Sequence, residues 1–233
     1  MELRVVPEKY SKLFEELKDR LGEGEILKSG GTTVYRINGF TVKITKISKI
    51  RKSRVFPYFF GPSKGYREYK NINLLRKNSF STPRPLFYWE IRVHGIAVES
   101  GFVEEYMENL IPVREVLKHK TGITETLTML ADVFRKLHDK GFFMRDLTFG
   151  NFFIRNNKIL MVDVSRMLYL HQPVPLILRL EDLSKVDSDG DELKLLMNFY
   201  WHDEGMASFA TKYITFRKKL RRQSKKITHS LRI

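Results

Sequence analysis

MRDLTFGN, residues 144–151, is the stretch that decides the fold of this chain, together with Asp163 further on. Two short apolar runs, residues 152–155 and 159–162, follow it and are separated by a turn-forming Asn-Asn-Lys segment. If the two runs pair as a hairpin, their equal lengths bring Asn151 and Asp163 side by side at its open end. Asp146 then lies one loop away from both.

These three side chains suit phosphoryl transfer from a nucleotide to a hydroxyl group. Mg²⁺ prefers a few oxygen ligands and keeps room for phosphate oxygens, so we expect Asn151 and Asp163 to bind it. Asp146, a carboxylate outside this ligand pair, is the expected base for the proton of the attacking hydroxyl. The spacing Asp-x4-Asn, with a further Asp one hairpin later, is typical of protein-kinase-like enzymes. The alternative is that all three are ordinary turn formers and helix caps.

A long amphipathic helix is expected before this loop. Apolar residues recur at helical spacing from Leu127 to His138, and Gly141 ends the pattern. A buried helix that leads into the catalytic loop is expected of a kinase C-lobe. His138 is interpreted as a helix-end histidine bonded to nearby backbone, and the alternative is a catalytic role.

The N-terminal third of the chain predicts the half that binds phosphates. Residues 26–37 read as strand, glycine turn and strand, and residues 40–44 read as a third strand after an Asn-Gly hairpin turn. Backbone amides exposed at Gly30 and Gly31 can bind phosphates. The full pattern G-x-G-x-x-G is missing, however, and a plain hairpin has the same signature.

Lys43 lies on the third of these strands, where the alternating pattern places it on the face opposite its apolar neighbours. A lysine there can reach the α- and β-phosphates of a nucleotide if an acidic residue holds it. Glu68, on a helix expected over residues 66–75, is the candidate partner, and the alternative is a solvent-exposed helix residue. Lys46 is the rival to Lys43, because a three-residue shift in register exchanges their roles.

The chain resembles the bacterial kinases that phosphorylate Kdo or heptose in the lipopolysaccharide inner core. The shared features are Lys43, Glu68, LHDKG at residues 137–141, RDLTFGNF at residues 145–152, and Asp163. The resemblance implies an α+β, bilobal protein-kinase-like fold with a small β-rich N-lobe and a mainly helical C-lobe. It also implies ATP and Mg²⁺ as cofactors and a lipid-linked sugar as acceptor.

The resemblance begins near Gly24 and continues to the C-terminus. We therefore expect one kinase-like domain over residues 1–233, with the N-terminal helix and N-lobe in residues 1–103. The hinge, the C-lobe and a basic C-terminal helix are expected in residues 104–233. In a kinase the crossing between lobes offers backbone groups to adenine, so Glu104 and Tyr106 are placed there by position.

Two departures from the kinase pattern narrow the class. Met144 stands where kinases usually have a histidine, and a thioether can fill that space without removing the base. Val164-Ser165 follows Asp163 in place of Phe-Gly, and no Ala-Pro-Glu segment follows. These departures argue against a regulated protein kinase and favour a compact small-molecule or glycolipid kinase.

Composition sets the outer bounds. The 233 residues, 42% of them hydrophobic, are typical of a globular chain with a substantial core. The absence of cysteine excludes disulfides and thiolate metal sites, and it agrees with a cytoplasmic location. We see no secretory signal and no apolar run near the roughly 20 residues that span a bilayer.

The charge is strongly basic, and its excess lies near the C-terminus. Lys and Arg number 42 against 27 Asp and Glu, which leaves a net charge of +15. Residues 206–233 contain no acidic residue, and aromatic and aliphatic residues recur among their basic residues at near-helical spacing. This pattern predicts a basic amphipathic helix on an anionic membrane surface. Nucleic-acid binding and a solvated helix face are the alternatives. The basic residues are Lys212, Arg217, Lys218, Lys219, Arg221, Arg222, Lys225, Lys226 and Arg232.

The predicted function is therefore transfer of the γ-phosphoryl group of ATP to a Kdo or heptose hydroxyl of the lipopolysaccharide inner core. The expected location is cytoplasmic and peripheral, on the inner face of the bacterial inner membrane. An atypical protein Ser/Thr kinase keeps the same residues and is one alternative. A non-catalytic basic binding protein on a kinase scaffold is the other.

Overall fold

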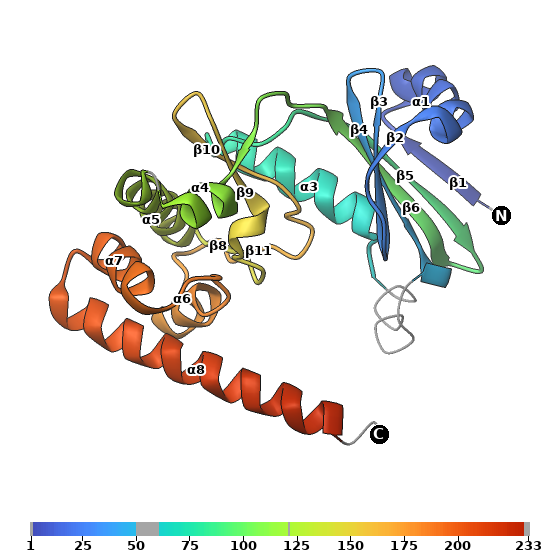
Figure 1. Ribbon diagram of the computed structural model, residues 1–233. Helices are drawn as coiled ribbons and strands as arrows, with labels where there is room; N and C mark the ends of the chain where they lie inside the picture. The colour runs from blue at the N-terminus through green and yellow to red at the C-terminus, as the bar shows by residue number, and fades with distance from the viewer. Residues whose placement is uncertain (1, 50–60, 121, 231–233) are drawn as a thin grey trace. The chain divides into compact units, whose positions relative to one another are not determined.

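The computed structural model describes residues 2–49, 61–120 and 122–230 (Figure 1). The chain divides into two compact units. The first contains Met1–Asn109 and Leu160–Ser165, and the second contains Leu110–Ile159 and Arg166–Ile233. The expected α+β class, with a small antiparallel sheet and a mainly helical remainder, is confirmed.

The first unit is built on a six-stranded sheet in the order β1-β5-β6-β4-β3-β2, with antiparallel neighbours. Two-residue turns connect β3 to β4 and β5 to β6. Asn38 and Gly39 adopt φ of 49° and 76°, and His94 and Gly95 adopt 48° and 79°. Positive φ at both positions is the signature of the type I′ hairpin turn. The strands are β1 (Glu2–Val6), β2 (Glu25–Lys28), β3 (Thr32–Ile37), β4 (Phe40–Lys46), β5 (Pro85–Val93) and β6 (Ile96–Glu105).

Two helices pack on this sheet. Helix α1 (Ser11–Asp19) buries Phe14 and Leu17 against Val42 and neighbouring apolar residues of the sheet. Helix α3 (Lys64–Lys77) packs against β5 and β6 and lies beside the face that carries Lys43. Because successive strand residues point to opposite faces, α1 and α3 cover opposite sides of the sheet. The remaining elements of this unit are the short 3₁₀ turns Glu8–Tyr10, Arg20–Glu23 and Ile47–Lys49.

The second unit is mainly helical. The helix predicted before residues 144–151 is α5 (Ile123–Asp139), and its apolar face from Leu127 to Leu137 is fully buried. Gly141 follows with φ of +84°, and a Cβ there would lie 2.5 Å from the carbonyl oxygen of Gln172, so only glycine fits this helix end. Helix α5 packs on α4 and α7, and α8 packs on α6 and α7. The other helices are α4 (Val113–His119), α6 (Leu176–Leu183), α7 (Gly190–Trp201) and α8 (Glu204–Ser230).

Short strands connect these helices. Strands β9 (Phe152–Arg155) and β10 (Lys158–Met161) are neighbours in a three-stranded sheet with β7 (Ile111–Pro112). Asn156 and Asn157 join them with φ of 48° and 57°, so the predicted hairpin is confirmed with β10 starting one residue early. Strand β8 (Phe142–Phe143) pairs with β11 (Leu168–Tyr169), and a 3₁₀ turn spans Phe149–Asn151.

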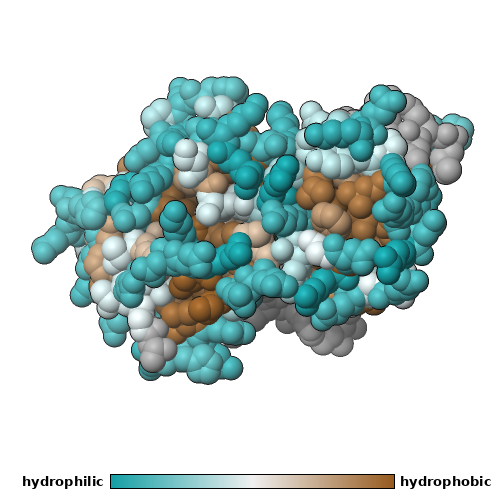
Figure 2. Space-filling view, turned by 90° about the horizontal axis from the view of Figure 1, so that it is seen from above, coloured by the Kyte–Doolittle hydropathy of each residue, from teal (hydrophilic) through white to brown (hydrophobic). Residues whose placement is uncertain are grey.

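Hydrophilic residues dominate the face of the molecule shown in Figure 2, and hydrophobic residues gather there in separate patches. Among the helices that the structure describes, none has the length and apolar character needed to cross a bilayer.

Candidate functional site

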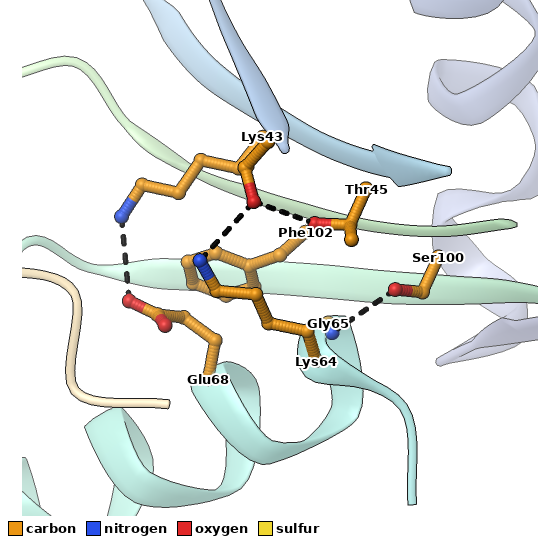
Figure 3. A pocket seen from close by; sticks show the side chains of 8 residues that line it. Lys43, Thr45, Lys64, Gly65, Glu68, Ser100 and Phe102 are labelled. Carbon is orange, nitrogen blue, oxygen red and sulfur yellow. Dashed lines mark hydrogen bonds and ion pairs between the residues drawn. The ribbon is translucent and has the colours of Figure 1, made fainter. Parts of the chain in front are cut away.

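Lys43 lies between two buried carboxylates. Its Nζ atom is 3.4 Å from Oε1 of Glu68 on α3 and 2.8 Å from Oε1 of Glu104 on β6. Lys43 and Glu68 point toward each other across one pocket in Figure 3. The pairing of Lys43 with Glu68 is the one predicted from the sequence. Glu104 is a second partner that the sequence did not predict.

This arrangement fixes the charge of Lys43. Burial would lower its pKa, but Glu104 and Glu68 outweigh burial and raise the pKa well above its ordinary value. Burial raises the pKa of Glu104, with a contribution from the charge of Glu68 that Lys43 opposes. Within the described ranges, the Oε2 atoms of Glu68 and Glu104 have no hydrogen-bond partner. Lys43 is therefore a permanent cation whose acidic neighbours retain acceptor capacity.

The register of β4 places Lys43, and not Lys46, in the pocket beside α3. Lys43 stands opposite Phe102 of β6 and faces α3, whereas Lys46 is half exposed and binds Glu99 at 3.1 Å. Residues three apart in a strand point to opposite faces, so only one of the two can face the pocket.

The glycine turn between β2 and β3 lies at the edge of the same sheet. Gly30 has φ of +152°, in the region that favours glycine, and no atom of the described residues lies within 4 Å of the position of a Cβ atom. The first residue after the turn, Thr32, shares a hydrogen bond of 2.8 Å with Thr45 on β4. The turn is thus tied to the strand of Lys43 and leaves open space over its backbone. The phosphate-binding role expected of Gly30 and Gly31 stays a prediction.

A pocket joins these elements within the first unit (Figure 3). Gly65 forms part of its wall, because α3 approaches β6 so closely that a Cβ there would lie 2.4 Å from the carbonyl oxygen of Gly101. The Gly65 amide also donates to Oγ of Ser100 at 3.3 Å. Lys64 enters this pocket, and the sequence did not single it out. The lining residues are Thr32, Lys43, Thr45, Lys64, Gly65, Glu68, Ser100 and Phe102.

Asp163 belongs to the first unit and lies beside Lys64, with Oδ1 3.4 Å from Nζ. Burial would raise its pKa, but the charges of Lys64, Lys43 and Lys28 hold the pKa below its ordinary value. Asp163 is therefore an ionised carboxylate, as a metal ligand must be.

The residue after Asp163 anchors this segment to α3. Val164 donates its backbone N–H to Oε1 of Glu68 at 3.2 Å, and its carbonyl accepts from Nδ2 of Asn71 at 2.8 Å. Glu68 thus holds both Lys43 and the peptide next to Asp163. The first unit thereby brings together three of the predicted residues: Lys43, Glu68 and Asp163.

Asp146 and Asn151 lie in the second unit. The Nδ2 atom of Asn151 donates to the backbone oxygen of Asp146 at 2.9 Å, which closes the loop between them. The side-chain nitrogen of Asn151 is used in this hydrogen bond, and its side-chain oxygen is the atom type that Mg²⁺ prefers. The Asp146 carboxylate forms an exposed ion pair with Arg166 at 3.2 Å. The juxtaposition of Asn151 with Asp163 stays a prediction.

Asp182 positions the start of the loop that carries Asp146, a role that was not predicted from the sequence. Asp182 on α6 is fully buried and accepts the backbone N–H groups of Met144 and Arg145, each at 2.7 Å. It also lies 3.3 Å from Nε2 of His138, whose Nδ1 is 2.7 Å from the hydroxyl of Tyr200. His138 is therefore structural as expected, but it contacts buried side chains instead of the expected backbone groups.

We expect Asp182→Ala to lower the thermal unfolding temperature by roughly 6–12 °C. The substitution leaves the buried N–H of Met144 and the part-buried N–H of Arg145 without their acceptor, at a cost of about 3 kcal/mol in the free energy of unfolding. Asp132→Ala removes a half-exposed carboxylate from α5 and serves as the control, with an expected change within about 0.5 kcal/mol. Equal melting temperatures for the two variants would contradict the role of Asp182.

Glu104 and Tyr106 were placed at the adenine crossing by position. The side chain of Glu104 is engaged with Lys43, and the backbone N–H of Tyr106 donates to the carbonyl of Gly39 at 2.9 Å. The guanidinium of Arg36 lies 4.2 Å from the centre of the Tyr106 ring. Their contact with adenine stays a prediction.

The basic C-terminal helix is real, but much of its charge is used within the second unit. Membrane binding, nucleic-acid binding and a solvated face all stay predictions for this helix, but the ion pairs reduce the number of its charges that face a partner. Lys225, Lys226 and Arg232 lie outside the side chains that the structure describes. Arg217 and Arg221 bind Glu181 at 2.6 and 3.0 Å, and Lys218 and Arg222 bind Asp189 at 3.2 and 2.5 Å.

Another face of α8 carries exposed apolar side chains. Phe209, Phe216 and Leu220 are exposed and recur at helical spacing, so they form one stripe. Lys212 and Lys219 are exposed beside it. A stripe of this kind, flanked by lysines, is typical of a helix that lies in a membrane interface.

Comparisons with known proteins agree with this geometry. The chain matches the family model "Lipopolysaccharide kinase (Kdo/WaaP) family" over residues 11–169, more than half of its length. Among solved structures it is similar to "WaaP in complex with acyl carrier protein", with a TM-score of 0.62 and 13% identity. That similarity covers 92% of this chain and 98% of the other chain. A comparison with curated protein sequences finds no match.

Proposed function

Because the chain belongs to the lipopolysaccharide kinase (Kdo/WaaP) family, we propose that it phosphorylates a Kdo or heptose hydroxyl of the lipopolysaccharide inner core, with ATP as donor. The observation that carries the proposal is the cluster of Lys43, Glu68 and Asp163 in the first unit. It combines a permanent cation with an ionised carboxylate, which is what binding of a magnesium nucleotide requires.

Each residue has a definite task in this proposal. Lys43, held by Glu68, orients the α- and β-phosphates. Asn151 and Asp163 are the residues that would hold Mg²⁺, and the metal would supply neutralisation of charge on the phosphates. Asp146 accepts the proton of the acceptor hydroxyl as its oxygen attacks the γ-phosphorus. The bond between the γ-phosphorus and the β,γ-bridging oxygen breaks, and ADP leaves. Positioning and charge neutralisation supply most of the acceleration.

The structural support for these assignments differs between the residues. Glu68 fixes Lys43 and the peptide after Asp163, and Asp182 fixes the loop that carries Asp146. Rigid support of this kind is needed, because small displacements of catalytic groups cost large factors in rate. For Gly30, Gly31, Glu104 and Tyr106, the proposal keeps the roles expected from their positions.

Mass spectrometry of the core oligosaccharide tests the acceptor. Cells that lack this gene should lose one phosphate group from the inner core, and its position identifies the sugar. Restoring the wild-type gene should restore the phosphate, and restoring the Asp163→Asn variant should not. An unchanged core would contradict the proposed substrate and would favour a protein or small-molecule acceptor. Purified protein, MgATP and isolated core oligosaccharide then test whether the kinase acts on it directly.

We also propose that the protein acts as a peripheral protein on the inner face of the inner membrane, through the stripe of Phe209, Phe216 and Leu220. The acceptor is an anionic glycolipid, so a helix that combines apolar and cationic side chains fits the surface that holds it. Among the side chains that the structure describes, Lys212 and Lys219 are exposed charges beside the stripe.

Replacing Lys212 and Lys219 with glutamine should weaken binding to anionic liposomes by roughly 30-fold, because each surface lysine contributes about 1 kcal/mol. Lys218→Gln with Arg222→Gln is the matched control, since it removes two charges that bind Asp189. Liposome flotation measures both variants. Equal loss in the two variants would contradict the assignment of the stripe. A loss of nucleic-acid binding in a gel shift, with liposome binding unchanged, would favour the alternative partner.

A further inference from the structure

Lys64 has a fixed position at the start of α3. The preceding residue, Ser63, is buried, accepts the N–H of Tyr66 at 3.1 Å and donates its own N–H to Oε1 of Glu90 at 3.3 Å. The following residue, Gly65, is pressed against the backbone of Gly101. The backbone of Lys64 is therefore held on both sides, and its side chain enters the pocket of Lys43 (Figure 3).

A lysine in this place is electrostatically unusual. The N-terminus of a helix carries partial positive charge, which favours anions and opposes a cation. Lys64 nonetheless occupies the first position of α3, and Lys43 lines the same pocket. Glu68 and Glu104 balance the charge of Lys43, so Lys64 and the helix N-terminus are the positive groups of this pocket that an incoming anion can use once Asp163 binds another cation.

The two contacts of Lys64 connect parts of the site with different tasks. Its Nζ atom donates to Oγ1 of Thr32 at 3.2 Å and lies 3.4 Å from Oδ1 of Asp163. Thr32 is the first residue after the glycine turn, and Asp163 is the proposed metal ligand. An ammonium group has three donors, so it can keep the contact with Thr32 while it exchanges the other partner.

Lys43 and Lys64 differ in the carboxylates that neutralise them. Lys43 has two buried carboxylates, so it stays paired whatever Asp163 binds. The carboxylate beside Lys64 is Asp163, and a metal at Asp163 would compete with Lys64 for it. A polyphosphate that arrives with the metal supplies a new anion for Lys64.

We propose that Lys64 is a second phosphate-binding lysine, which pairs with Asp163 in the nucleotide-free protein and with a phosphate of the nucleotide in the loaded protein. The inference rests on the proposed function, and it concerns the donor nucleotide alone. It explains how a turn with only two glycines, Gly30 and Gly31, can hold a triphosphate. In longer glycine-rich loops further backbone N–H groups bind the phosphates, and here the ammonium group of Lys64 donates hydrogen bonds in their place. Exchange of Lys64 between two anions involves no covalent step.

Lys64→Gln is the test, because glutamine retains polarity and removes the charge. Titration calorimetry without Mg²⁺ should show ATP binding about tenfold weaker than in the wild-type protein, as expected for one charge-assisted hydrogen bond. Adenosine, which has no phosphate, should bind with unchanged affinity. Mg²⁺ alone, in the absence of nucleotide, should bind the variant more tightly, because the cation that competes for Asp163 is gone.

Two further variants make this result specific. Lys46→Gln removes an equal charge from the same strand as Lys43, outside the pocket, and should leave both affinities unchanged within about twofold. Lys64→Arg keeps the charge and should retain most of the ATP affinity. A purely structural role for Lys64 predicts equal losses for ATP and adenosine, and that outcome overturns the inference. Equal ATP affinity of Lys64→Gln and wild type overturns it as well.

Failure of this inference can be told apart from failure of the proposed function. If wild-type protein binds ATP and phosphorylates core oligosaccharide while Lys64→Gln is unaffected, only the role of Lys64 is wrong. If the wild-type protein binds no ATP, both proposals are wrong. If it binds ATP and the predicted pattern holds but core oligosaccharide is not phosphorylated, the role of Lys64 stands and the acceptor is wrong.

Discussion

Asp163→Asn is expected to lower kcat by about 10³-fold or more, with loss of the dependence of the rate on Mg²⁺ concentration. Asparagine keeps an oxygen donor but loses the negative charge, so we expect Mg²⁺ to bind much more weakly, and a metal in this position contributes several kcal/mol to the transition state. Asparagine is also the substitution that leaves the backbone unstrained. Asp163 has φ of 53°, and asparagine is among the few residues that adopt this region readily, whereas alanine does not.

Three controls show whether the loss of activity in Asp163→Asn comes from the metal site: thermal unfolding, a surface variant and a second metal ion. Asp163 also contacts Lys64, so thermal unfolding should show a small change, and steady-state rates should be compared only for variants that melt normally. Asp132→Asn, on the surface of α5, should retain wild-type kcat. Mn²⁺ accepts similar ligands and should not restore the rate. A variant that keeps a tenth of the wild-type kcat at saturating Mg²⁺ would remove Asp163 from the metal site.

The strands of the first unit were predictable because their signals are local. The Asn38-Gly39 dipeptide requires a tight hairpin, and alternation on either side of it sets which residues share a face. Lys43 could therefore be placed on a face from its neighbours alone. The choice between Lys43 and Lys46 could not be made in this way, because it depends on the pairing of β4 with β6, which is distant in sequence.

Two roles that the sequence did not reveal belong to carboxylates whose partners are distant in sequence. Asp182 lies on a short amphipathic helix, where a carboxylate is normally read as solvent exposed. Its partners are the N–H groups of Met144 and Arg145, and no local pattern connects them. Glu104 was placed by position as a neighbour of adenine, and its ion pair with Lys43 follows only from the tertiary pairing of strands. Buried charges of this type are set by long-range contacts, which periodicity does not report.

In the C-terminal helix α8, the number of basic residues likewise does not reveal which of them form ion pairs within the protein. The excess of basic residues predicts attraction to anions, but it does not identify the anion. Glu181 and Asp189 take four of these cations within the protein. In the part of the helix whose side chains the structure describes, the surface beside Lys212 and Lys219 stays exposed to a partner.

Asp146→Asn is expected to lower kcat by 10²- to 10⁴-fold, the usual contribution of a positioned general base, while the affinity for ATP stays close to wild type. We expect kcat to fall while the ATP affinity is kept, because the nucleotide phosphates are assigned to Lys43 and its neighbours, whereas Asp146 acts only on the acceptor hydroxyl. The half-exposed ion pair of Asp146 with Arg166 contributes little to stability, so the variant should fold normally.

Arg166→Gln separates the two possible reasons for such a loss. It breaks the same ion pair at 3.2 Å and leaves the carboxylate of Asp146 in place. If Asp146 is the base, Arg166→Gln should retain kcat within about tenfold of wild type, a much smaller effect than that of Asp146→Asn. If Asp146 serves only to hold Arg166, the two variants should lose activity equally. Single-turnover rates, measured with the enzyme in excess over the acceptor and with ATP saturating, report the chemical step and distinguish these results. Equal rates for the two variants would transfer the catalytic assignment from Asp146 to the ion pair.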